Sequence, residues 1–398
     1  MYKTSISQSV QEYFSWNRIT LLAVGLWPYQ QSRFARFQAA LCLSILTSFV
    51  VFVLSRICFV EYDFEFTIDM LSLSTYYSFF LMNYISFWIN IETIRYLLEQ
   101  FQYIYNRLKD SNEIAIYNKY GNIAKRITLA CILIGICNHA YLTVIQCGPY
   151  ILDVIMPKNV SYARHLIVTL TTYFAVQERY FYLLLLYLNA VCTVGTVVIL
   201  AVGTMLVSCF KYICGMLRVA SYRFEQAITA MVQSITIKNE TMIYKEFICA
   251  VDIHRKAMEI AKIVVGDMER SLFIVTMSTV LCMSLNLYGI LQVESPMQEM
   301  EKLIGHCVNI ICLFLYMFIS NYSGQEIMDS NDRIFLTVYN APWYLVPLKI
   351  QKLILFLLQR SNKAFTLDIG GLFTLSIESF ASLVSTSVSY FTVLLSLR

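Results

Sequence analysis

Seven stretches of the chain are long and apolar enough to cross a lipid bilayer as helices. About 20 mostly apolar residues are needed to span the hydrocarbon core. The seven stretches are 37–60, 66–91, 127–152, 180–208, 271–293, 303–325 and 370–397. Because a spanning backbone must satisfy its own hydrogen bonds, they predict an all-α membrane protein with seven transmembrane helices. The composition agrees, since 14% of the 398 residues are charged, against about a quarter in a soluble domain.

The segments between the spans indicate how the chain is oriented. Those after spans two, four and six are long, and they lie on the same side as the N-terminus together with most of the Lys and Arg residues. Positive charge marks the cytoplasmic side, so we expect a cytoplasmic N-terminus and an extracellular C-terminus. The glycosylation sequon at Asn159 would then be extracellular, and the one at Asn239 cytoplasmic.

The long inner segments carry helical patterns of their own. Residues 344–363 alternate Lys, Gln and Arg with apolar positions at Leu345, Leu348, Leu353, Phe356 and Leu357, which is typical of an amphipathic helix. Similar patterns at 92–120 and 217–265 predict that spans two, four, five and six continue into the cytoplasm as helices. We expect one domain over 1–398. Its region 326–369 would either anchor subunits to one another or lie on the inner membrane surface.

The sequence contains no recognisable catalytic set. There is no Walker loop, HExxH or GxSxG motif, and the 12 cysteines and 4 histidines are scattered. A membrane histidine, such as His139 or His306, is more often a hydrogen-bond partner between helices than a metal ligand. No block of Lys and Arg suggests a nucleic-acid partner. We therefore predict that the protein is not an enzyme and that it binds no cofactor, metal or nucleic acid.

Three classes of membrane protein remain: a receptor coupled to an intracellular partner, a ligand-gated pore and a transporter. A G-protein-coupled receptor would place its N-terminus outside and would usually carry DRY-like and NPxxY motifs, which this sequence lacks. Transporters often have broken spans and charge near the membrane midplane. Here the spans hold few charges and one proline, Pro149, near an outer end.

The C-terminal quarter carries a specific pattern. Its residues are Gly324-Gln325, Tyr339, Trp343, Pro347 and the closing Ser389-Tyr390-Phe391. In order, spacing and position the pattern resembles the insect odorant receptors. The related gustatory receptors are a second possibility, although their seventh span usually shows a TY…QF pattern that is absent here.

The resemblance implies a non-selective cation channel that is gated by a volatile organic ligand. It implies a heterotetramer with a shared co-receptor subunit in the plasma membrane of olfactory sensory neurons, in contact with membrane lipids. The co-receptor type carries a long insertion between spans four and five. Segment 209–268 has no such insertion, so the chain resembles the odour-tuning subunit. A seven-helix receptor that signals through a G protein is the alternative.

A stripe of hydroxyl side chains follows one face of the last span, 370–397. Ser379, Ser382, Thr386, Ser389, Val393 and Ser396 recur at steps of three and four residues, which keeps them on one side of a helix. Hydroxyls can solvate cations in a pore, but small residues also allow close helix packing, and the pattern alone leaves both open. The resemblance favours a pore lined by Ser382, Thr386, Ser389, Val393 and Ser396, and it implies a hydrophobic gate at Val393.

The resemblance also implies a ligand pocket in the outer half of the membrane, among spans two to six. Small-ligand sites are mostly apolar and aromatic with a few polar anchors. The outer halves supply Met70, Ser74, Tyr77, Asn138, His139, Leu142, Tyr187, Met283, Asn286 and His306. Ordinary helix packing is an equally good explanation for each of these residues.

Overall fold

The computed structural model describes residues 12–30, 32–59, 64–108, 110–155, 180–233, 237–293, 300–361 and 365–396; Asn159 lies outside them. Its helices are α2 (Ser15–Ala23), α3 (Arg33–Phe59), α4 (Phe64–Ile89), α5 (Ile91–Tyr105), α6 (Ser111–Ile155), α8 (Phe181–Gln233), α9 (Ile237–Gln292), α10 (Met300–Asn340), α11 (Leu348–Ser361) and α12 (Ile377–Ser396), with a 3-10 turn η2 at Trp343–Leu345. Strands β1 (Asp368–Ile369) and β2 (Phe373–Thr374) pair antiparallel before α12.

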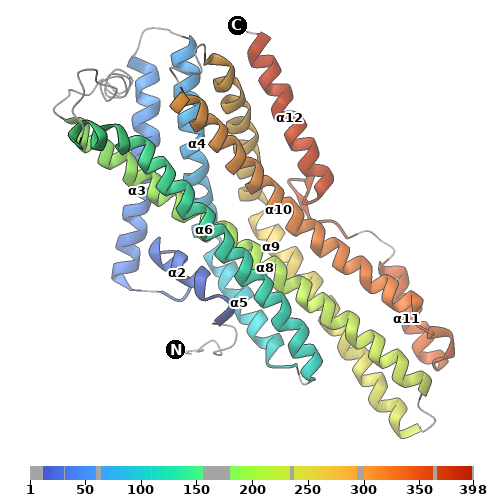
Figure 1. The fold of residues 1–398 in the computed structure, drawn as a ribbon. Coiled ribbons are helices and arrows are strands. Elements are labelled where there is room, and N and C mark those ends of the chain that lie inside the picture. Colours follow the sequence, from blue (N-terminus) through green and yellow to red (C-terminus); the bar gives the residue numbers. More distant parts are fainter. Residues whose placement is uncertain are drawn as a thin grey trace.

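The predicted seven-helix, all-α architecture is confirmed. Among the described residues, α3, α6, α8, α9, α10 and α12 have both the length and the hydropathy of membrane spans. The seventh span is α4, which has 26 residues and contains Asp69 and several Tyr and Ser side chains. It packs against α3 and α9 within the bundle (Figure 1).

Four helices are much longer than a bilayer is thick. α8 has 53 residues and α9 has 56, or about 80 Å each at about 1.5 Å per residue, against about 30 Å of hydrocarbon. The excess length of α6, α8, α9 and α10 projects from the end of the bundle opposite the C-terminus (Figure 1). The predicted helical continuation of spans four, five and six is therefore confirmed.

The second span does not continue in the same way. α4 ends at Ile89, and α5 follows as a separate helix from Ile91. The Asn90 side-chain amide donates to the carbonyl oxygen of Ser86 at 2.8 Å, so it satisfies a backbone group where the helix stops. Asparagine often ends helices by such local side-chain bonds.

The last helix is shorter than the predicted range 370–397. Gly370 and Gly371 have φ of 61° and 65°, a left-handed conformation that suits glycine, and they turn the chain between β1 and β2. α12 then begins at Ile377, with the Ser376 hydroxyl accepting the Ser379 N–H at 3.1 Å as an N-cap. The apolar composition of 370–376 therefore belongs to a turn and a strand that pack against the bundle.

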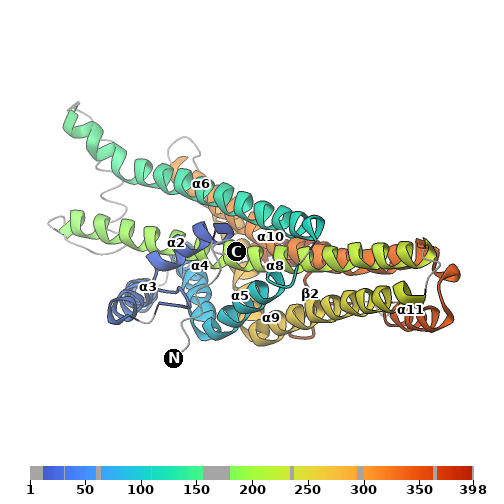
Figure 2. The ribbon, with the colours of Figure 1, turned by 90° about the horizontal axis from the view of Figure 1, so that it is seen from below.

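α8 is the central helix, and it packs against α6, α9 and α10 (Figure 2). In the projecting part of the bundle, Arg223 forms two hydrogen bonds with Glu113 of α6, at 2.5 and 2.7 Å. The same guanidinium donates to the Cys249 sulfur of α9 at 3.1 Å. Both charged side chains of the pair are buried, so this ion pair connects three helices inside the protein.

Candidate functional site: an internal cavity and the outer face of the last helix

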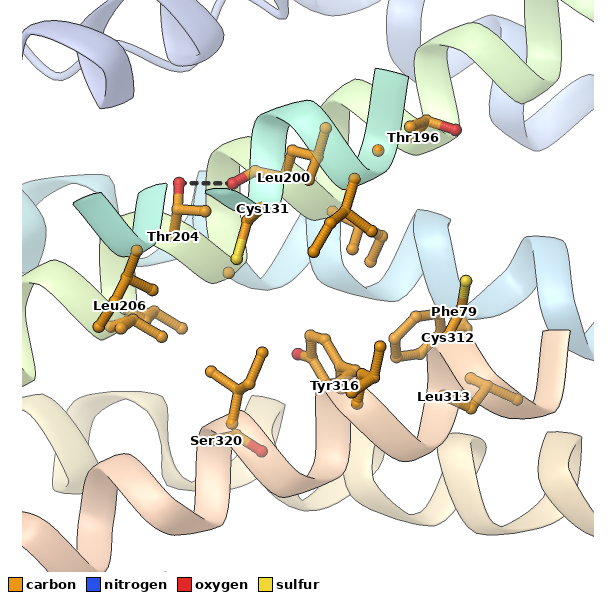
Figure 3. Close-up of a pocket in the computed structure, with 18 of the residues that line it drawn as sticks. Phe79, Cys131, Thr196, Leu200, Thr204, Leu206, Cys312, Leu313, Tyr316 and Ser320 are labelled. Atoms are coloured by element: carbon orange, nitrogen blue, oxygen red, sulfur yellow. Dashed lines mark hydrogen bonds between the residues drawn. The ribbon is translucent and has the colours of Figure 1, made fainter. Parts of the chain in front are cut away.

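A cavity of about 220 Å³ lies where α4, α6, α8, α9 and α10 meet (Figure 3). That volume is many times the roughly 10–15 Å³ that one water molecule requires, and it suits a small organic molecule. α6 contributes residues between Ile127 and Asn138, α8 residues between Thr196 and Phe210, and α10 residues between Cys312 and Ser320. Leu375, in the segment that leads into α12, completes the wall.

The wall of the cavity is mainly apolar and aromatic, and three of its hydroxyl groups, those of Thr204, Tyr316 and Ser320, already have partners. Thr204 donates to the Leu200 carbonyl at 2.6 Å (Figure 3). Tyr316 donates to Asn83 Oδ1 at 2.9 Å. Burial of apolar surface, at about 25 cal/mol per Å², would therefore dominate the affinity for a ligand.

Asn138 is a polar side chain of this wall with a weak partner. Its side-chain amide points across the gap between α6 and α10 to Cys312, with an N–S distance of 3.9 Å. Sulfur is a weak acceptor, so a ligand with a better acceptor could take its place. Nearby wall residues Ile134 of α6 and Leu315 of α10 are exposed on the outside of the bundle, which makes this gap the rim of the cavity.

Asn138 is also the only one of the ten predicted ligand residues that lines the cavity. The cavity lies nearer the middle of the spans than the predicted outer-half pocket. The other nine residues lie outside its wall. Ligand contact by those nine stays a prediction.

Two of the nine take part in an aromatic cluster. Tyr77 and Tyr187 lie on either side of Phe49, with ring-centre distances of 4.3 and 5.9 Å. The Tyr77 hydroxyl is 2.9 Å from the Cys192 sulfur, and the Tyr187 hydroxyl is 2.7 Å from Ser48 Oγ.

Three others form polar contacts between helices. Asn286 and His306 share a hydrogen bond of 3.0 Å between α9 and α10, and His139 of α6 lies 3.1 Å from Thr193 of α8. The remaining four are Met70, Ser74 and Met283, which are buried, and Leu142, which is half-buried. The contacts of Asn286, His306 and His139 are hydrogen bonds of the kind that polar side chains commonly form between helices in membrane bundles.

α12 presents two different faces. Its inner face packs on α9 and α10 through buried Leu383 and Ser387. The Ser284 hydroxyl of α9 donates to the Ser387 carbonyl at 2.9 Å, and the Phe380 ring lies 5.0 Å from the ring of Phe314. Close packing by a small residue therefore occurs at Ser387, which is not a member of the predicted stripe.

The outer face of α12 carries the predicted hydroxyl stripe. Ser382, Ser389 and Ser396 are exposed, Thr386 is half-buried, and Val393 is 54% exposed. The hydroxyls of Thr386 and Ser389 donate to carbonyls of their own helix at 2.8 and 3.0 Å, so their oxygen lone pairs still face outward. Ser385 and Thr392 are also exposed on this side; the stepwise pattern missed them, although their hydroxyl chemistry was a usable signal.

Comparison with known proteins agrees with this architecture. Residues 63–388 match the family model described as 7tm Odorant receptor. The chain is 27% identical over 90 residues to Odorant receptor 10 of Aedes albopictus, covering 21% of this chain and 24% of that protein. It is 31% identical over 85 residues to Odorant receptor 22c of Drosophila melanogaster, covering 21% of each. The aligned segments thus span about a quarter or less of these relatives.

The fold is also similar to a solved structure, that of the insect olfactory receptor OR5 from Machilis hrabei in complex with eugenol. The TM-score is 0.73 at 14% identity, with 99% of both chains covered. A second structure of the insect olfactory receptor OR5 from Machilis hrabei gives a TM-score of 0.72 at 13% identity, and the match covers 98% of this chain and 99% of that one. Since the family model covers most of the sequence and the fold agrees along its whole length, the chain belongs to the odorant receptor family of seven-helix membrane proteins.

Proposed function

We propose that the protein is the odour-binding subunit of a ligand-gated, non-selective cation channel. The exposed hydroxyl face of α12 carries this proposal. One side of the helix packs in the bundle, whereas the other presents Ser382, Ser389 and Ser396 outward from an apolar membrane span. Ser389 and Ser396 donate to carbonyls of α12, but their oxygen lone pairs remain available as acceptors, and a water-filled axis between subunits would provide donors for them.

In this proposal the volatile ligand occupies the 220 Å³ cavity. Its apolar and aromatic wall favours small, weakly polar molecules, and Asn138 would donate to an ether, carbonyl or hydroxyl oxygen at the rim. The OR5 complex with eugenol concerns a molecule of this general kind bound to a protein of the same fold.

A second feature supports assembly with other subunits. α11 buries Ile350, Ile354 and Leu357 against the bundle, yet it leaves Leu348, Leu355 and Phe356 exposed at the projecting end. These three residues define the outer face of α11. We propose that this face packs against neighbouring subunits, including the shared co-receptor, in a heterotetramer of the neuronal plasma membrane with the projecting helices in the cytoplasm.

The test is a recording from excised membrane patches, without nucleotides, of cells that express the chain with the co-receptor. A panel of aliphatic alcohols, esters, ketones and methoxyphenols is applied. We expect at least one compound to open a cation current that the co-receptor alone does not give. A current that requires GTP would instead support the alternative of a receptor acting through a G protein.

A further inference from the structure

The cavity and the last helix meet at a single residue, Leu375. Its side chain lines the cavity and is 6% exposed. α12 begins two residues later, at Ile377. No other described part of the cavity wall belongs to the segment that leads directly into α12.

α10 holds this segment at unusually close range. A Cβ added at Gly324 would lie 2.5 Å from the Leu375 carbonyl oxygen and would overlap the Leu375 side chain. Only glycine permits this approach of the two backbones. The adjacent Gln325 accepts the Ile377 N–H through Oε1 at 3.4 Å, so α10 contacts both the cavity residue and the first residue of α12.

The hairpin holds the segment from its other side. The Leu375 N–H donates to the Leu367 carbonyl at 2.9 Å. The Gly370 N–H donates to Glu269 Oε1 of α9 at 3.0 Å. Leu375 therefore lies in a short backbone segment that is hydrogen-bonded to α9 and α10. Because no free loop adjoins Leu375, a displacement of its side chain must also move this segment.

We propose that Leu375 is the positioning residue through which occupancy of the cavity sets the position of α12. A ligand in the cavity contacts the Leu375 side chain and shifts the backbone that enters the first turn of α12. The inference rests on the proposed channel function. It adds to that function a distinction between Leu375, which would link ligand binding to the position of α12, and the wall residues that only contact the ligand.

Leu313 provides a matched control. It is also a leucine of the cavity wall, it is 1% exposed, and it lies on α10 away from the α12 junction. Leu375→Ala and Leu313→Ala remove the same atoms from the same cavity. Each is expressed with the co-receptor at matched surface density, and the probe is the panel compound that gives the largest wild-type current.

Two quantities are measured: the dose–response curve of the current, and the rise in Tm of the purified complex on adding the probe, which reports binding. For Leu313→Ala we expect a higher half-maximal concentration, a smaller rise in Tm and an unchanged maximal current. For Leu375→Ala we expect the maximal current to fall about fivefold or more, the scale of typical coupling between sites, while the rise in Tm persists. Leu375→Met should restore the maximal current.

The inference is overturned if Leu375→Ala only shifts the half-maximal concentration, as Leu313→Ala does. If Leu375→Ala does not reach the membrane, Leu375→Val replaces it under the same two criteria. If panel compounds raise the Tm of the wild-type complex but none of them opens a current, the channel function itself is contradicted, and the coupling proposal fails with it.

Discussion

The two halves of α8 lie in opposite environments. Near its start, the side chains of Tyr182 and Leu186 are 70% and 69% exposed, and they face the outside of the bundle. From Cys209 to Ser221 nearly every side chain is buried, including Lys211 and Tyr212. One continuous helix is thus exposed near its start and almost wholly buried over 209–221, and Glu225, Gln226 and Thr229 are exposed again nearer its end.

The difference suggests that the projecting half stabilises the fold, whereas the membrane half contains the candidate functional sites. Three helices share the buried Arg223–Glu113 pair in the projecting half. In the membrane half, α6 and α10 leave the rim of a cavity between them, and α12 is packed on one side only. Moving parts are drawn from the less stable regions of a protein, so we expect ligand binding and gating in the membrane half and mutational sensitivity of stability in the projecting half.

The largest effect on stability is expected from breaking the buried ion pair. Arg223→Ala leaves the Glu113 carboxylate buried without its partner, which typically costs about 3–5 kcal/mol. We expect a large fall in the apparent Tm of the detergent-purified protein and a loss of surface expression.

Arg255→Ala is the control, because Arg255 pairs with Asp252 on the surface, with side-chain exposures of 78% and 50%. Exposed pairs contribute about 0–1 kcal/mol, so its Tm should stay close to that of the wild type. Equal effects of the two substitutions would contradict the view that the projecting half is the rigid support.

Hydropathy predicted the seven helices because it measures the free energy of placing a segment in lipid. It could not locate the first residue of α12, because residues 370–376 are as apolar as a span but form a turn and a strand at Gly370 and Gly371. The break at Asn90 was missed for a similar reason, since a single side-chain hydrogen bond does not alter the pattern around it.

The cavity was harder to predict than the stripe on α12. The stripe lies on one helix and follows from its period, and the structure leaves most of its side chains exposed, while their lining of a pore stays a prediction. The cavity is formed by five helices and by Leu375, and most of its wall consists of ordinary residues such as Leu200 and Ile319. Which of these enclose empty space depends on how the helices meet, and no single-helix pattern contains that information.

The next largest effect concerns assembly through the outer face of α11. Leu355 is 66% exposed, and burying such a side chain at an interface is worth about 1.5–3 kcal/mol. Leu355→Glu should therefore weaken co-purification with the co-receptor while the Tm of the isolated chain is unchanged.

Ile19→Glu is the control for that experiment, since Ile19 is 56% exposed and belongs to α2, a helix that lies far from α11 (Figure 1). We expect it to leave co-purification intact. Undiminished assembly of Leu355→Glu would indicate that α11 lies on the inner membrane surface instead.

A smaller effect should distinguish two glycines of α8. A Cβ at Gly195 would lie 2.7 Å from Phe80 Cε2, whereas a Cβ at Gly203 would meet its nearest atom, Tyr316 Cε2, at 3.9 Å. Gly195→Ala should destabilise the protein by about 1–3 kcal/mol through overpacking. Gly203→Ala should keep the wild-type Tm, because the cavity has room for the methyl group.

Because Gly203 lines the cavity, its alanine variant should still raise the half-maximal ligand concentration. The two variants thus separate loss of packing from loss of binding, using thermal unfolding and dose–response curves. A normal dose–response curve for Gly203→Ala would place the ligand elsewhere, for example among the outer-half residues around Asn286.

The central claim, that the hydroxyl face of α12 lines a cation pore, is tested by the unliganded current of two valine variants. Val393 lies on the hydroxyl face, whereas Val384, nine residues earlier, lies on the opposite side of α12 and packs against the core of the bundle. At matched surface expression with the co-receptor, Val393→Ser should raise the current without ligand, because a polar ring no longer excludes water. The increase is partial if co-receptor subunits supply the rest of the ring. Val384→Ser should leave the current at the wild-type level; equal unliganded currents in both variants and the wild type would contradict the pore assignment.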